Sequence, residues 1–136
     1  MIDYEVRIEA PATVVFDMLT RADLLTEWMA AEARVDLRPG GEFHWIYPNG
    51  DVVLGRFIEI DHPRRLVLAY GWESPASRAI PPSSTEVEIT LDEVDGATLL
   101  RLVHRGLPAS EIEPHRGGWE YFMGRLRSAI GQEQRA

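Results

Sequence analysis

Residues 114–132, PHRGGWEYFMGRLRSAIGQ, are the stretch that decides the fold. Their apolar side chains recur at i, i+3, i+4, i+7 and i+11, which places them on one face of an α-helix. Burying five such side chains contributes roughly 7–15 kcal/mol at about 1.5–3 kcal/mol each, against a net stability of roughly 5–15 kcal/mol for a small domain. We therefore expect a long core-filling helix within Pro114–Gln132, with Gly117 and Gly118 as its unstructured lead-in. The five side chains are Trp119, Phe122, Met123, Leu126 and Ile130.

The N-terminal third predicts one strand and two short helices. Residues 3–10 alternate between apolar and charged side chains, as in a half-buried strand. Pro11 ends this strand and can open a helix over residues 12–19. Asp23 is placed to cap a second short helix over residues 24–29.

Six further segments alternate and are separated by turns. The Asn49-Gly50 pair is a strong hairpin signal, and Gly55 indicates a bulge or a close backbone approach. Residues 73–84, rich in proline and serine, predict a mobile connector. Hairpin succession implies an antiparallel sheet, and the final helix on one face makes an α+β layer fold. The predicted strands are 33–37, 42–47, 52–60, 65–72, 85–93 and 97–105.

Composition excludes several classes of function. The chain has 136 residues, the length of one domain (1–136), and its net charge is −8. All 14 basic residues are scattered arginines, which argues against nucleic-acid binding. No apolar run is long enough to span a membrane. Without a cysteine or a signal peptide, the expected location is the cytoplasm.

Several motifs, taken in order, resemble the START-like superfamily, also called SRPBCC or helix-grip. Within it the chain resembles the heat-shock-protein-90 ATPase-activator homologues in their stand-alone bacterial form, over essentially its whole length. The resemblance implies a curved antiparallel sheet that grips the C-terminal helix, with an apolar cavity between them. The matching segments include Ile8-Glu9-Ala10-Pro11, Arg38-Pro39-Gly40-Gly41-Glu42-Phe43, Gly55-Arg56-Phe57-Ile58-Glu59-Ile60, His104-Arg105-Gly106 and Gly118-Trp119.

A set of aromatic side chains on predicted inward faces forms the candidate ligand site. Each of them alone is more simply a core residue, but together they can line a pocket, since ligand pockets are mostly apolar with a few polar groups. His104 shares a face with Leu100 and Leu102 at the end of the last strand, where we expect it to mark the polar end of the cavity, with Tyr70 or Tyr47 nearby. The candidate ligand-binding residues are Trp28, Phe43, Trp45, Tyr47, Tyr70, Trp72, His104, Trp119, Phe122 and Met123.

No metal or cofactor is expected. Glu111, Glu113 and His115 alternate, but a predicted loop would not fix their geometry as metal ligands. His44 is expected to face solvent and His62 to lie in a turn. The sequence contains no nucleophile elbow, phosphate loop or dinucleotide fingerprint.

The sequence is compatible with three functions. The favoured one is binding of a small hydrophobic or aromatic ligand, polyketide-like or lipid-like, in the internal cavity. The alternatives are a cyclase or aromatase that uses His104 and a tyrosine as acid–base pair, and a protein-interaction module related to chaperone ATPase activators. We expect no nucleic acid or membrane partner, and either a monomer or a homodimer.

Overall fold

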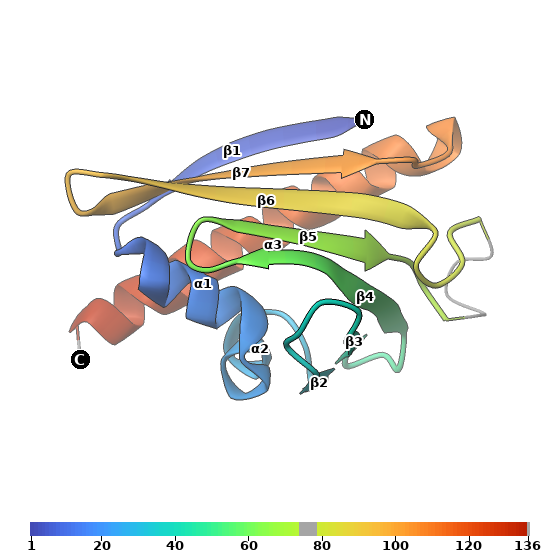
Figure 1. Cartoon of the computed structure of the whole chain (residues 1–136), viewed down its shortest axis with the longest axis horizontal. Coiled ribbons are helices and arrows are strands. Elements are labelled where there is room, and N and C mark those ends of the chain that lie inside the picture. Colours follow the sequence, from blue (N-terminus) through green and yellow to red (C-terminus); the bar gives the residue numbers. More distant parts are fainter. Residues whose placement is uncertain (74–78, 136) are drawn as a thin grey trace.

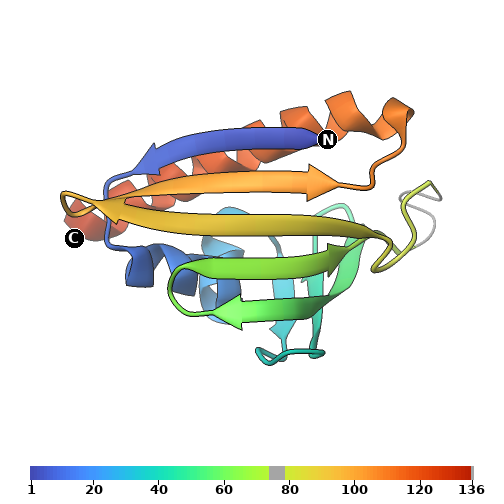
Figure 2. The same cartoon turned by 45° about the horizontal axis from the view of Figure 1, so that its top comes forward.

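A computed structural model describes residues 1–73 and 79–135, and for 132–135 it describes the backbone alone. One face of a seven-stranded sheet carries all the described helices (Figures 1 and 2). The strand order is β1-β7-β6-β5-β4-β3-β2, and every neighbouring pair is antiparallel. The strands are β1 (Ile2–Ile8), β2 (Glu32–Val35), β3 (Glu42–Ile46), β4 (Val52–Asp61), β5 (Arg65–Tyr70), β6 (Thr85–Val94) and β7 (Ala97–Arg105).

The helices are α1 (Ala12–Thr20), α2 (Ala22–Trp28) and α3 (Ala109–Arg135). The α+β helix-grip arrangement predicted from the sequence is confirmed, including the two short helices after the first strand. None of the helices in the described ranges is both long enough and apolar enough to cross a membrane.

Helix α3 begins earlier than the sequence indicates. It starts at Ala109, so Pro114, Gly117 and Gly118 lie inside it rather than in a lead-in. Proline and glycine have low helix propensity, but packing of an apolar helix face supplies most helical stability in proteins. Trp119, the first residue of that face, is 6% exposed. Tertiary packing therefore overrides the local signals.

One smaller prediction changes, and another is confirmed in one of its two alternatives. Helix α2 begins at Ala22, so Asp23 lies in its first turn instead of capping it, and its carboxylate pairs with Arg21. The irregularity in β4 lies between Phe57 and Glu59. Gly55 instead marks a close approach, since an added Cβ would collide with the Ala69 carbonyl. Of the predicted mobile connector, residues 74–78 lie outside the described residues.

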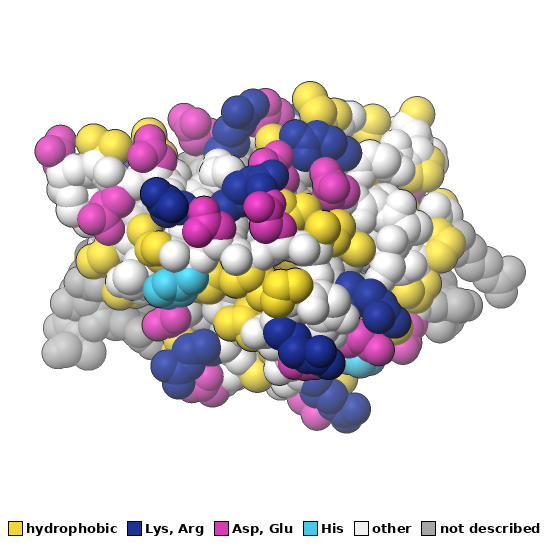
Figure 3. All heavy atoms as spheres, in the orientation of Figure 1, with side chains coloured by type: hydrophobic (Ala, Val, Ile, Leu, Met, Phe, Trp, Pro, Cys, Tyr) yellow, Lys and Arg dark blue, Asp and Glu magenta, His cyan; other side chains and the backbone are white. Residues whose placement is uncertain are grey.

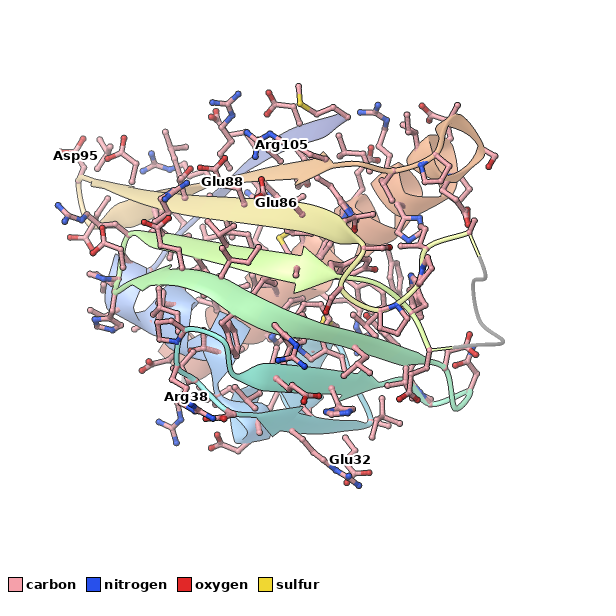
Figure 4. All side chains as sticks on the ribbon, turned by 45° about the vertical axis from the view of Figure 1, so that its right-hand side comes forward. Glu32, Arg38, Glu86, Glu88, Asp95 and Arg105 are labelled. Atoms are coloured by element: carbon pink, nitrogen blue, oxygen red, sulfur yellow. The ribbon has the colours of Figure 1, made fainter. Side chains whose placement is uncertain are left out.

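The outer face of the sheet carries paired charges on either side of a central group of hydrophobic side chains (Figure 3). Basic and acidic side chains alternate across it (Figure 3). Arg105 on β7 reaches Glu86 at 3.1 Å and Glu88 at 2.9 Å on β6 (Figure 4). Arg65 on β5 completes the row at 2.9 Å from Glu88. These ion pairs lower the pKa of the Glu88 carboxyl, with Arg105 as the larger cause. The main hydrophobic core lies on the opposite face, between the sheet and the helices.

Candidate functional site

Side chains fill the middle of the interface between the sheet and α3. Trp28, Trp45 and Met123 are at most 6% exposed, and the space left among them and their neighbours is about 10 Å³. One water molecule needs about 10–15 Å³. In the described part of the chain, the predicted internal cavity is therefore too small for a polyketide or a lipid. This corrects the expectation, and it places Trp28, Phe43, Trp45 and Met123 in the packed core.

At one end, the interface between the sheet and α3 instead opens into a groove of about 230 Å³ that is lined by aromatic side chains. Tyr47 follows β3, Tyr70 ends β5, and Trp72 lies two residues beyond it. Helix α3 supplies the opposite wall at i, i+3, i+4 and i+7 from His115, which is one face of a helix. The lining residues are Tyr47, Tyr70, Trp72, Pro114, His115, Gly118, Trp119 and Phe122.

The rings of this groove pack against one another. The Tyr47 ring centroid lies 5.5 Å from that of Trp72 and 5.5 Å from that of Phe122, with interplanar angles of 31° and 47°. Tyr70 stands nearly perpendicular to Trp72, at 86°. Tilted and edge-to-face contacts are favoured aromatic geometries. The groove wall is therefore a preformed surface that three separate parts of the chain build together.

A buried hydrogen-bond chain fixes the groove from behind. The indole Nε1–H of Trp119 donates to His104 Nδ1 at 3.1 Å. Because an indole nitrogen can only donate, Nδ1 carries no proton, and His104 Nε2–H donates to Thr85 Oγ1 at 2.8 Å. The Thr85 hydroxyl in turn donates to the Tyr70 carbonyl at 2.8 Å. The tautomer of His104 is thus set by its partners.

His104 lies at the end of β7, as predicted, but it is fully buried and lies outside the groove lining. Its hydrogen-bond partners are Trp119 and Thr85. Of the two tyrosines predicted nearby, Tyr70 contacts it edge-on at 4.8 Å between ring centroids. Burial, and secondarily the nearby His115, lowers the pKa of His104 to about 3. A neutral imidazole with both nitrogens engaged supports the wall and is poorly placed to act as a base.

A second Trp–His pair ties the rim of the groove together. Trp72 Nε1–H donates to His115 Nε2 at 3.1 Å. His115 Nδ1 lies 3.0 Å from the Glu111 carbonyl oxygen, which can only accept, so Nδ1 carries the proton. This pair joins the segment after β5 to the start of α3, and it gives His115 the tautomer opposite to that of His104.

Tyr47 and Tyr70 also bring phenol hydroxyls to the groove. Burial raises the pKa of Tyr47 and of Tyr70 well above the ordinary value of a phenol. For Tyr70, the nearby Tyr47 and Glu111 add to this effect, whereas Trp72 acts against it. Both groups are therefore neutral hydroxyls at physiological pH.

The sequence interpretation missed three members of the groove, Pro114, His115 and Gly118, because it placed the start of α3 too late. The spacing of His115, Trp119 and Phe122 is itself helical and could have shown that they share a face. A correct helix start would have added His115 to the candidate site.

The other histidines lie elsewhere. His44 on β3 is half-buried and alternates with the buried Phe43 and Trp45. His62 is exposed and its ring meets that of Phe16. Within residues 1–73 and 79–135, no group of three His, Asp or Glu side chains is arranged to hold a metal ion.

A larger but shallower hollow of about 350 Å³ lies between α2 and α3. Its aromatic side chain, Tyr121, is 60% exposed, and Arg125 at its edge donates to the Trp28 carbonyl at 2.7 Å. It is a furrow in the surface with few apolar contacts to offer. The aromatic groove is therefore the candidate site.

Known proteins share both sequence and fold with this chain. It is 28% identical over 120 residues to the human activator of 90 kDa heat shock protein ATPase homolog 1, covering 86% of this chain and 33% of that protein. The chain spans about a third of the length of the curated relatives it matches.

Solved structures agree with this likeness. PFC0360w, an HSP90 activator from Plasmodium falciparum, superposes with a TM-score of 0.77 at 25% identity, covering 96% of this chain and 97% of that one. CalU16 from Micromonospora echinospora has a TM-score of 0.77 at 27% identity, covering 97% and 76%. The family model described as activator of Hsp90 ATPase homolog 1-like protein matches residues 9–131. The chain therefore belongs to the family of activator of Hsp90 ATPase homolog 1-like proteins, with the helix-grip fold expected from its sequence.

Proposed function

We propose that this protein binds a small aromatic ligand in the groove between the end of β5 and the first turns of α3. The observation that carries the proposal is the lining, in which five aromatic side chains and Pro114 surround an open space of about 230 Å³. Ligand pockets usually measure about 300–1,000 Å³. A compact ring system with one edge exposed to water therefore suits this groove better than a long lipid chain.

The hydrogen bonds behind the wall support binding. Trp119 and Trp72 are each held by a histidine, so the rings that would contact a ligand are already fixed. A preformed site loses less conformational entropy when its ligand binds. The cyclase or aromatase alternative needs an acid–base pair that faces the ligand, and both ring nitrogens of His104 and of His115 are already bonded. The described residues therefore favour binding over catalysis.

A thermal-shift screen of flat aromatic compounds tests this proposal. A ligand at 100 times its dissociation constant raises stability by about 2.7 kcal/mol if it binds only the native state. Phe122→Ala removes a groove ring and should abolish the shift. Tyr121→Ala removes its exposed neighbour on the same helix and should preserve the shift. Hits that respond equally to the two substitutions would place the ligand elsewhere.

A chaperone partner is a second candidate function. PFC0360w, called an HSP90 activator, matches this chain over nearly the whole length of both. If this protein acts in the same way, adding it to an Hsp90-class chaperone should raise the rate of ATP hydrolysis. An unchanged rate at saturating protein would exclude this candidate without affecting the first.

A further inference from the structure

The absence of basic side chains among the described residues of the groove lining narrows the class of ligand. We infer that the groove selects an uncharged aromatic ring system and discriminates against the same ring carrying a carboxylate. This inference rests on the proposed function, because it concerns the same groove. It goes further in excluding aromatic and fatty acids as the preferred ligands.

No described residue that lines the groove is basic. A buried carboxylate is stable only when it is paired with a cation or accepts several hydrogen bonds. The lining residues within the described part of the chain offer it aromatic rings, a proline ring and a glycine instead. A carboxylate enclosed among these residues would lose part of its water shell without gaining an ion pair from any of them.

The side-chain N–H donors of the described lining residues are already engaged. Trp72 and Trp119 donate to His115 and His104, and His115 Nδ1–H donates to the Glu111 carbonyl. Pro114 has no backbone N–H. Turning the Trp119 N–H toward a ligand would leave the buried His104 Nδ1 without a partner. Turning the Trp72 N–H would break the bond that joins Trp72 to His115 at the rim of the groove.

The two phenols cannot replace those donors. Each neutral hydroxyl has a single proton, which can satisfy one carbonyl oxygen, whereas a carboxylate presents about four acceptor sites. Burial in the same surroundings raises the pKa of Tyr47 and of Tyr70, because it disfavours negative charge on their phenols. An anionic ligand would meet the same penalty.

The N-terminus of α3 does not compensate for this. A helix N-terminus attracts anions through its unpaired N–H groups, but the effect falls off within the first turn. That turn begins at Ala109 and contains Glu111, and the lining begins only at Pro114. The groove therefore lies beyond the part of the helix that binds anions.

Two probes of the same shape test the inference: 2-naphthamide, which is neutral, and 2-naphthoate, which is ionised at pH 7.5 because carboxylic acids titrate near pH 4. Binding is followed by the NMR signals of the indole N–H groups of Trp72 and Trp119, in 0.15 M salt to screen the net charge. We expect 2-naphthamide to bind at least tenfold more tightly. Equal or tighter binding of 2-naphthoate would overturn the inference while leaving the proposed function intact, and failure of both probes to bind would remove the two together.

A matched pair of substitutions shows whether local charge is the cause. Gly118 lines the groove and Gly117 is its exposed neighbour, and a Cβ added at either meets no atom within 4 Å. Gly118→Lys should cancel or reverse the tenfold preference, because it places a cation at the groove. Gly117→Lys makes the same change in net charge away from the groove and should leave the preference as it is. Identical ratios in the two variants would contradict the inference.

Discussion

The two Trp–His pairs of this protein have the same chemistry in different surroundings. In each, an indole N–H donates to an imidazole nitrogen at 3.1 Å. His104 is fully buried and Trp119 is 6% exposed, whereas Trp72 and His115 are half-buried at the rim of the groove. The second imidazole nitrogen bonds a side chain, Thr85, in the first pair and a helix carbonyl in the other.

Burial decides what each pair contributes. A buried polar group that loses its partner costs about 1–3 kcal/mol, because water cannot replace the lost bond. At the rim, water can reach a freed nitrogen at little cost. The Trp119–His104 pair should therefore stabilise the fold, and the Trp72–His115 pair should mainly shape the groove. Three predictions test this division.

The largest effect is expected from Trp119→Ala. The substitution removes a large core side chain and leaves a cavity, so the free energy of unfolding should fall by about 3–5 kcal/mol. Denaturant titration measures this loss. Arg127→Ala on the same helix is the control, since Arg127 is exposed and surface substitutions usually change stability by about 0.5 kcal/mol or less. Similar losses in the two variants would show that α3 does not fill the core.

The second prediction concerns the pH dependence of stability. The folded pKa of His104 is about 3, and the unfolded value is about 6.5. Between these values the unfolded state binds the proton and the folded state does not, so stability falls as the pH falls. From pH 7 to pH 5, His104 should lower the free energy of unfolding by about 2 kcal/mol.

His104→Gln tests this assignment, because glutamine keeps a hydrogen-bonding side chain that does not titrate. The difference in unfolding free energy between pH 7 and pH 5 should shrink by about 2 kcal/mol in the variant. His62→Gln, at an exposed position, provides the comparison and should keep the wild-type slope. An unaltered slope in His104→Gln would mean that the buried pair is accessible to protons.

The fold was largely predictable because its signals are local. Alternation in residues 85–93 and 97–105 anticipates β6 and β7 to within one residue, and the turn between them carries positive φ at Asp95 and Gly96. The start of α3 was not predictable in this way. Its local signals, Pro114 and the two glycines, disfavour a helix. The packing that outweighs them is made with residues distant in sequence.

The candidate site was predictable only in part. Inward-facing aromatic residues follow from strand period, which identifies Tyr47, Tyr70 and Trp72 as candidates. Whether such residues fill a core or line a groove depends on how closely α3 approaches the sheet, and no sequence pattern reports that distance. The pairing of Trp119 with His104 depends likewise on helix placement, so the sequence pointed to a tyrosine instead.

The smallest and most selective effect is expected when both tryptophans receive the same substitution. Trp119→Phe leaves the buried His104 Nδ1 without its donor, and the free energy of unfolding should fall by at least about 1 kcal/mol beyond the volume change. Trp72→Phe frees His115 Nε2 at the rim, where water can bond it, so its loss should stay below about 1 kcal/mol. Because the chemical change is identical, the difference between the two losses of unfolding free energy measures the effect of burial on the hydrogen bond.

Denaturant titration gives both values, and the indole N–H of Trp119 in wild-type protein should exchange with deuterium more slowly than that of Trp72. If Trp72→Phe proved the more destabilising of the two, the rim pair would be the one that holds the fold together, and the division between stability and recognition would be wrong.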